Sequence, residues 1–410
     1  MTRVVLLMLF PLTVAAQEKG ANPVINQLRM AVVVQQSALP ASSYGDSSFE
    51  PGISTLPASQ QAPKVPPEQK SRPTPSKKPQ SEPTKPRIPS SMVGYIDNAI
   101  VGSQIRIRFD AAFHNDAPDR AEFFYAQCSC IPNGPGPNPV VADLNFQQLY
   151  LHGEFAPTKR FSFFTEVPVR WIQPNVIAAP GTPNLTNEGG ISDLAAGFKL
   201  AALASSDRYL TFQLQAYFPS GNASIGLGTH HYNVEPALLY YQRLSDRVAL
   251  EAQVGDSHPI GGSTCLRPGQ LSASLTPPAG DSCNTGLTPA QPPNSEEFAG
   301  DVLFYGVGPS YVLYRSENVK IAPAIELVGW RVLGGFETKN VAVKTAPGMS
   351  SGSDDIQEAV SAEGTNIVNL KVGARTAVGA HSSFYVGYGH QLAHAVWYKE
   401  IVRAEYRYSF

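Results

Sequence analysis

Apolar and polar residues alternate with a period of two through most of the chain after residue 102. From Ile105 to Phe113 every second residue is apolar, and Arg106, Arg108 and Asp110 stand between them. Successive side chains of a β-strand point to opposite faces, so this pattern predicts a strand with one apolar and one charged face. The alternation recurs at 144–155, 161–171, 194–200, 210–218, 232–241, 248–254, 302–314, 319–330, 367–377, 384–388 and 398–410.

The connections between these segments alternate between short and long. The short ones are 156–160, 205–208, 244–247, 315–318 and 379–382, and the long ones are 115–140, 173–190, 219–231, 257–299 and 332–365. Short turns at one end and long loops at the other are typical of outer-membrane barrels. The sequence therefore predicts an all-β fold, a transmembrane antiparallel up-and-down β-barrel of about twelve strands.

The composition supports this fold. Charged residues make up 16% of the chain, against about 25% in ordinary soluble domains. No run of about 20 apolar residues is present to form a membrane-spanning helix. The net charge of -2 gives no indication of a nucleic-acid partner.

The first 16 residues have the pattern of a secretory signal peptide. Arg3 precedes the apolar run Val4 to Leu12, and Val14-Ala15-Ala16 forms a small-residue cleavage site. Residues 17–90 then form a polar stretch in which prolines recur among Lys, Gln and Ser from Pro57 onward. Such composition favours a disordered, semi-rigid linker. We expect this linker in the periplasm, as a solvated spacer or in contact with the cell wall, and residues 91–410 in the barrel.

The last strand carries a terminal aromatic signature. Tyr406, Tyr408 and Phe410 share one face of the segment, and Arg403, Glu405 and Arg407 share the other. The aromatic face is expected to meet outer-membrane lipid. A terminal Phe after alternating aromatics resembles the signal that the barrel assembly machinery reads. That machinery is therefore an expected partner.

A motif in the middle of the chain resembles a known family. Gly190-Ile191-Ser192-Asp193-Leu194, continuing to Leu200, is followed by Phe218-Pro219-Ser220-Gly221 and by Asn233-Val234-Glu235-Pro236-Ala237-Leu238. Together these segments resemble bacterial outer-membrane barrels labelled putative transporters or meta-pathway of phenol degradation proteins. The resemblance implies passage of small, often aromatic, solutes.

The polar face of the strands supplies the candidate pore. Because a lipid-facing Arg or Lys at the bilayer midplane costs about 2–4 kcal/mol, charged residues within strands are expected to point inward. They form either a salt-bridged interior network or a charged constriction that selects solutes. The predicted pore-lining residues are Arg106, Arg108, Asp110, Glu166, Arg170, Lys199, Glu235, Glu251, Glu326, Lys371, Arg375 and Arg403.

All four cysteines fall in predicted external loops: Cys128 and Cys130 in the first, Cys265 and Cys283 in the fourth. In an exported protein they favour disulfides, either Cys265–Cys283 or cross-links between the two loops. A zinc site at Cys-Ser-Cys is the alternative, but its spacing is not that of a zinc finger. No metal or other cofactor is expected.

The leading function is passive movement of small, aromatic or hydrophobic solutes through a porin-like barrel. A closed barrel that displays its loops for adhesion or protection is the main alternative. An outer-membrane hydrolase would need a histidine beside a serine, and the one such spacing, His381-Ser382-Ser383, falls in a predicted periplasmic turn. A soluble all-β enzyme is the remaining alternative, and no enzymatic activity is expected.

Overall fold

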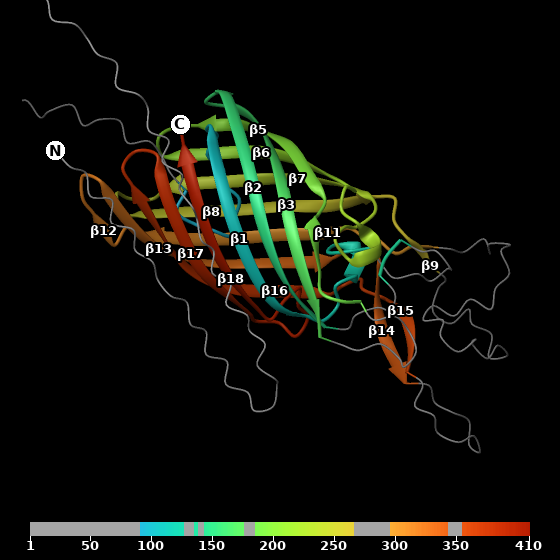
Figure 1. The fold of residues 1–410 in the computed structure, drawn as a ribbon. Coiled ribbons are helices and arrows are strands. Elements are labelled where there is room, and N and C mark those ends of the chain that lie inside the picture. Colours follow the sequence, from blue (N-terminus) through green and yellow to red (C-terminus); the bar gives the residue numbers. More distant parts are fainter. Residues whose placement is uncertain (1–90, 127–134, 138–142, 176–184, 266–295, 343–354) are drawn as a thin grey trace, which may run out of the picture. The chain divides into compact units, whose positions relative to one another are not determined.

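The computed structural model describes residues 91–410 except 127–134, 138–142, 176–184, 266–295 and 343–354. Twelve strands of this part form a closed antiparallel barrel (Figure 1). The predicted barrel is therefore confirmed. In their order around the wall the strands are β1 (Gln104–Asn115), β2 (Leu144–Thr158), β3 (Phe161–Pro174), β5 (Leu194–Ala204), β6 (Arg208–Phe218), β7 (Tyr232–Arg243), β8 (Val248–Ile260), β11 (Val302–Tyr311), β13 (Val319–Val332), β16 (Asn366–Val378), β17 (Ser382–Gln391) and β18 (Glu400–Ser409).

Short elements extend the barrel strands and the long loops. β4 (Glu188–Ile191) pairs with β3, and β12 (Tyr314–Arg315) pairs with β13, so the predicted segment 302–314 is two strands. In the long loops, β9 (Thr264–Cys265) pairs with β10 (Glu296–Glu297), and β14 (Phe336–Ala342) pairs with β15 (Asp355–Ser361). The described residues also form the 3-10 turns η1 (Arg120–Glu122) and η2 (Ala223–Ile225).

The wall has an apolar outer face and a polar inner face. On β1 the side chains of Ile105, Ile107 and Phe109 are exposed, while Arg106 and Asp110 are buried. On β18 Tyr408 is exposed and Arg403 and Arg407 are buried. An apolar exterior around a charged interior is the pattern of a barrel that lies in lipid.

No helix in the described part of the chain is both long enough and apolar enough to cross a membrane.

The sequence pattern of the segment 144–155 breaks near Gln147-Gln148, a break typical of a bulge, but the strand has no bulge there. Both residues keep regular register with β1, and the irregularity lies between Ala112 and Asn115. Buried side chains change from Leu144 and Phe146 to Gln148. The inner face is thus apolar near the long loops and polar deeper in the barrel, and this change of lining interrupts the sequence pattern.

Prolines mark three interruptions of strand pairing. β3 pairs with β5 up to Glu166 and with β4 from Val169, so Pro168 lies at the exchange. Pairing is also interrupted at Pro236 between β7 and β8 and at Pro309 between β11 and β13. A proline lacks the N–H that a strand ladder needs, which accounts for each gap. Pro323, by contrast, lies in continuous register with β16.

Candidate functional site

Residues 91–101, here called the lumen segment, lie inside the barrel and not in its wall. Val93 and Ala99 have 0% exposed surface. Val93 and Ile96 pack against Ala324 and Val328 of β13. Residues 99–101 pack in a second cluster with side chains from β5, β6, β7 and β11. Val101 lies shortly before β1 begins at Gln104, so the segment enters the lumen from the end that carries the short turns.

One carboxylate holds the apex of the lumen segment. Glu326 of β13 accepts hydrogen bonds from the backbone N–H groups of Gly94 at 2.9 Å, Tyr95 at 2.8 Å and Ile96 at 2.9 Å. The Tyr385 hydroxyl donates to the same carboxylate at 3.1 Å. Buried backbone donors must find acceptors, and Glu326 serves three at once.

Further wall residues bind the segment on either side of this apex. Met92 N donates to Glu251 Oε1 at 3.0 Å and Asp97 N to Gln253 Oε1 at 2.7 Å. The guanidinium of Arg375 donates to the Val93 carbonyl at 2.8 Å, and that of Arg403 donates to the Gly94 carbonyl at 2.6 Å. The wall charges therefore satisfy the backbone polar groups of the segment.

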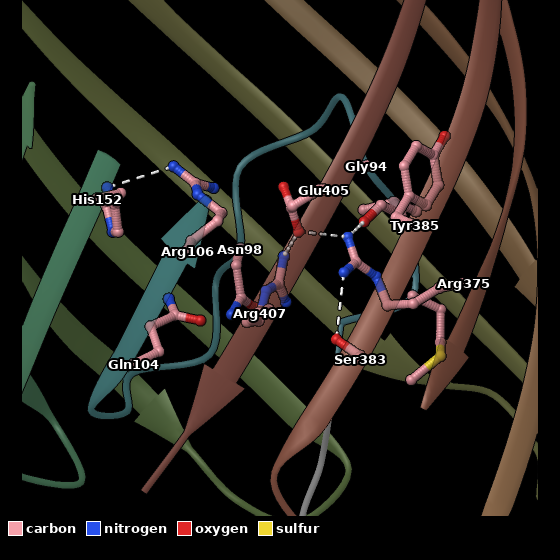
Figure 2. Close-up of polar contacts among 12 residues, drawn as sticks. Gly94, Asn98, Gln104, Arg106, His152, Arg375, Ser383, Tyr385, Glu405 and Arg407 are labelled. Atoms are coloured by element: carbon pink, nitrogen blue, oxygen red, sulfur yellow. Dashed lines mark hydrogen bonds and ion pairs between the residues drawn. The ribbon is translucent and has the colours of Figure 1, made fainter. Parts of the chain in front are cut away.

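A network of buried ion pairs surrounds the segment. Glu405 pairs with Arg375 at 2.8 Å and with Arg407 at 3.0 Å, and Figure 2 shows this cluster beside Tyr385 and Ser383. The two carboxylate oxygens of Asp110 accept hydrogen bonds from Nε and Nη2 of Arg403, each at 2.7 Å. Such bidentate pairs are strong and fixed in geometry.

The other end of the lumen is closed by residues 116–126, here called the mouth loop. Tyr125 and Ala126 are fully buried, and Tyr125 packs in a cluster with Leu144, Ile172 and Trp397. Arg120 pairs with Glu337 of β14 at 2.5 Å and donates to the Val396 carbonyl at 2.7 Å. Ala121 and Glu122 have φ of 48° and 52°, a left-handed backbone that costs about 1–3 kcal/mol per non-glycine residue. Tertiary contacts therefore hold this loop in the mouth.

Asp119 is a buried carboxyl group of the mouth loop with an altered pKa. Burial raises the pKa of its carboxyl group to about 7, from an ordinary value of 3.8, although hydrogen bonds from Thr338 of β14 oppose the rise. A carboxyl group whose pKa is raised on folding contributes stability below its ordinary value and loses it as pH rises through the raised value.

We predict that the mouth loop is held more firmly at pH 5 than at pH 8. Hydrogen exchange of residues 116–126, corrected for the intrinsic pH dependence of exchange, measures this. In Asp119→Asn, which is neutral at every pH, the corrected protection should not change with pH. Equal protection of the wild-type loop at both pH values would contradict the prediction.

The structure places the predicted pore-lining residues on the inward face, and brings most of them together in pairs. Arg106 and Arg108 contact Glu166, Asp110 contacts Arg403, and Lys199 contacts Glu154. Glu251 and Glu326 bind the lumen segment instead of a cation. Arg108 and Glu235 are half-buried, and the others are buried. Whether these residues line a conducting path remains a prediction.

Two parts of the site were not predicted from sequence. The apolar pairs Met92-Val93 and Ile100-Val101 are a sequence signal for a buried lumen segment, because they lie between the linker and the first alternating strand. The burial of Phe124 and Tyr125 has no such signal, since nothing in residues 115–140 distinguishes a loop folded inward from one in solvent.

The remaining candidate groups have structural partners or lie outside the described residues. His381 Nδ1 contacts the Ser409 carbonyl at 2.6 Å, Ser382 contacts Tyr406, and Ser383 accepts from Arg375, which gives the hydrolase alternative no support. Cys128, Cys130, Cys283 and the side chain of Cys265 are outside the described residues, so the disulfides remain a prediction. The same holds for the signal peptide and the linker.

The one described group of three His, Asp or Glu residues with mutual metal-ligand spacing is Asp256, His258 and Asp301. His258 Nδ1 lies 2.7 Å from Asp301 Oδ1, and all three residues are at least partly exposed. His258 and Asp301 are therefore paired with each other within the chain.

The family-like motif has a structural role in the wall. Asp193, between β4 and β5, accepts hydrogen bonds from the backbone N–H groups of Gly221 at 2.9 Å and Thr229 at 2.8 Å. It thereby fixes the loop that contains η2 against the wall.

Phe410 is exposed at the end of the last strand, where its N–H donates to the Ser103 carbonyl. The ring centroids of Tyr406 and Phe384 lie 4.8 Å apart.

Comparison with solved structures finds other barrels at low identity. An outer membrane channel from Pseudomonas putida F1 shares 15% identity over 78% of this chain and 100% of that chain, with a TM-score of 0.44. The β domain of the Bordetella autotransporter BrkA shares 14% over 75% of this chain and 100% of that chain (TM-score 0.40), and the KdgM porin shares 10% over 75% and 99% (TM-score 0.32). No family model matches the chain, and neither does any curated protein.

Proposed function

We propose that this protein is an outer-membrane channel for small solutes, that the lumen segment blocks it in this structure, and that the mouth loop covers its outer end in a faster open–closed equilibrium of its own. The observation that carries the proposal is the binding of the lumen segment to Glu326 through three N–H groups. Hydrogen bonds keep the segment in the lumen, and no covalent closure or strand pairing is needed. A barrel blocked by a removable segment is a gated passage.

The arrangement of the lumen supports passage after these two segments move. The middle of the barrel is lined by charged side chains such as Arg375, Glu405 and Arg403, while apolar clusters seal both ends. A wall built only for rigidity would have little need of buried charges, since apolar side chains of similar volume stabilise a core equally well. The charges therefore fit a lining that meets water when the channel opens.

Further features of the proposal follow from the sequence pattern. The short-turn end and both ends of the barrel domain face the periplasm, where residues 17–90 extend as a linker, and Tyr406, Tyr408 and Phe410 present the signal for the assembly machinery. Solutes cross by passive diffusion. Resemblance to the meta-pathway barrels supports aromatic or hydrophobic cargo.

A closed structural barrel is the second candidate, and the apolar seals at both ends favour it. The two candidates differ in what happens when the lumen segment is absent. Liposomes that carry the chain from Gln17 or the chain from Gly102 should both be tested for swelling in arabinose. If the protein is a channel, liposomes with the shorter chain should swell faster. Swelling of both samples at the rate of empty liposomes would support the closed structural barrel instead.

A further inference from the structure

Arg170 of β3 is unusual among the lumen cations because it forms no ion pair with a carboxylate in the part of the chain that the structure describes. Most inward cations pair with a carboxylate, as Arg106 does with Glu166 and Arg375 with Glu405. Among the described residues, no carboxylate lies within ion-pair distance of Arg170. A buried guanidinium without an anion is costly, so its actual partners are informative.

A single residue of the mouth loop supplies the main partners of Arg170. The Phe124 carbonyl oxygen accepts a hydrogen bond from Arg170 Nη1 at 2.7 Å. The Phe124 ring lies beneath the same guanidinium, with 4.0 Å between the guanidinium carbon and the ring centroid. Arg170 Nε donates to Gln148 Oε1 at 3.2 Å, which fixes the orientation of the guanidinium.

The surroundings of this contact are aromatic. The Phe146 ring lies 4.6 Å from that of Phe124, and Tyr398 lies 6.3 Å beyond Phe146. Lys371, the other inward cation without a carboxylate at ion-pair distance among the described residues, donates to the Tyr398 hydroxyl at 2.6 Å. A row of rings therefore runs between two cations that, among the described residues, form no ion pair with a carboxylate.

Phe124 resembles a ligand in chemical terms. Its carbonyl carbon, Cα, Cβ and ring reproduce the skeleton of 3-phenylpropanoate, with one carbonyl oxygen where the solute would have a carboxylate. A carboxylate would make a charge-assisted, bidentate contact that the neutral carbonyl cannot make. The strained backbone at Ala121 and Glu122 indicates that this position of Phe124 costs free energy.

We propose that Arg170 binds aryl-alkyl carboxylates, and that Phe124 occupies the site as an internal surrogate when the channel is closed. The inference rests on the proposed function and names its solute class. An arriving 3-phenylpropanoate displaces Phe124, neutralises Arg170 and frees the mouth loop. The site thus couples recognition of an anionic aromatic solute to opening of the outer mouth.

Calorimetric titration of the refolded chain from Gln17 with 3-phenylpropanoate tests this. We expect saturable binding that weakens at least about tenfold with uncharged 3-phenylpropan-1-ol and in Arg170→Gln, because both lose the charge-assisted contact. Arg331→Gln, a change at an exposed outward arginine, is the matched control and should bind as wild type. Equal affinity for the acid and the alcohol, or unchanged affinity in Arg170→Gln, would overturn the inference.

A second variant keeps the test independent of folding defects. Phe124→Ala removes the surrogate, so its affinity for 3-phenylpropanoate should rise about fivefold or more, since the competent state becomes more populated. Misfolding could only lower the affinity, so a gain cannot arise from a folding defect. Unchanged or weaker binding by a variant with the heat-modified gel mobility of wild type counts against the proposal. If arabinose still enters liposomes through the chain from Gly102, the channel itself stands even where the carboxylate site fails.

Discussion

Replacing Glu326 with alanine is expected to release the lumen segment and to raise the fraction of open channels roughly 100-fold. The change removes the shared acceptor of Gly94, Tyr95 and Ile96. Leaving a buried donor without an acceptor costs about 1–3 kcal/mol each. Even the low end, about 3 kcal/mol for three donors, corresponds to roughly a hundredfold shift in the closing equilibrium.

Open probability in planar bilayers, measured on the chain from Gln17, is the readout for this variant. Glu317→Ala is the matched control, because Glu317 is an exposed residue in the turn just before β13. It should leave the open probability unchanged. A Glu326→Ala channel as closed as wild type, with its barrel intact by heat-modified gel mobility, would show that this carboxylate does not hold the segment.

Replacing Arg375 with methionine is expected to destabilise the barrel by about 3–5 kcal/mol, the cost of removing one member of a buried ion pair. The Arg375 side chain is fully buried, and its guanidinium contacts Glu405, the Val93 carbonyl and Ser383. Methionine keeps much of the volume but leaves Glu405 with Arg407 alone.

Guanidinium unfolding of the refolded chain in detergent measures this loss. Arg315→Met, at an exposed residue of β12, should shift the free energy of unfolding by less than about 0.5 kcal/mol. A shift that small for Arg375→Met as well would show that the buried pair contributes little to the barrel.

The barrel could be predicted from sequence because each strand carries its own signal. In β1, Arg106 and Asp110 must avoid lipid, so alternation alone assigns both faces of the strand. The inward position of Arg375 and Glu326 follows by the same reasoning. In β2 the rule that inward residues are polar fails at Leu144 and Phe146, because the mouth of the lumen is itself apolar.

The contacts that close the lumen could not be predicted in the same way. Glu326 was expected to line the pore, but its partners are backbone N–H groups, which every residue carries and no side-chain pattern reveals. Phe124 meets Arg170 only because residues far apart in the sequence are brought together by the closed wall. Strand periodicity assigns a face to Arg170, and only the fold supplies the loop that covers it.

The conductance of the barrel from Gly102, measured before and after addition of a synthetic peptide of residues 91–101, shows whether the lumen segment closes a passage. If the lumen segment closes a passage, the shortened barrel should give stable current steps in a planar bilayer. The peptide should then block these steps when added to the side that carries the short turns, and a Gly94→Pro peptide, which lacks one of the N–H donors to Glu326, should block more weakly. A shortened barrel that folds but passes no current would contradict the account.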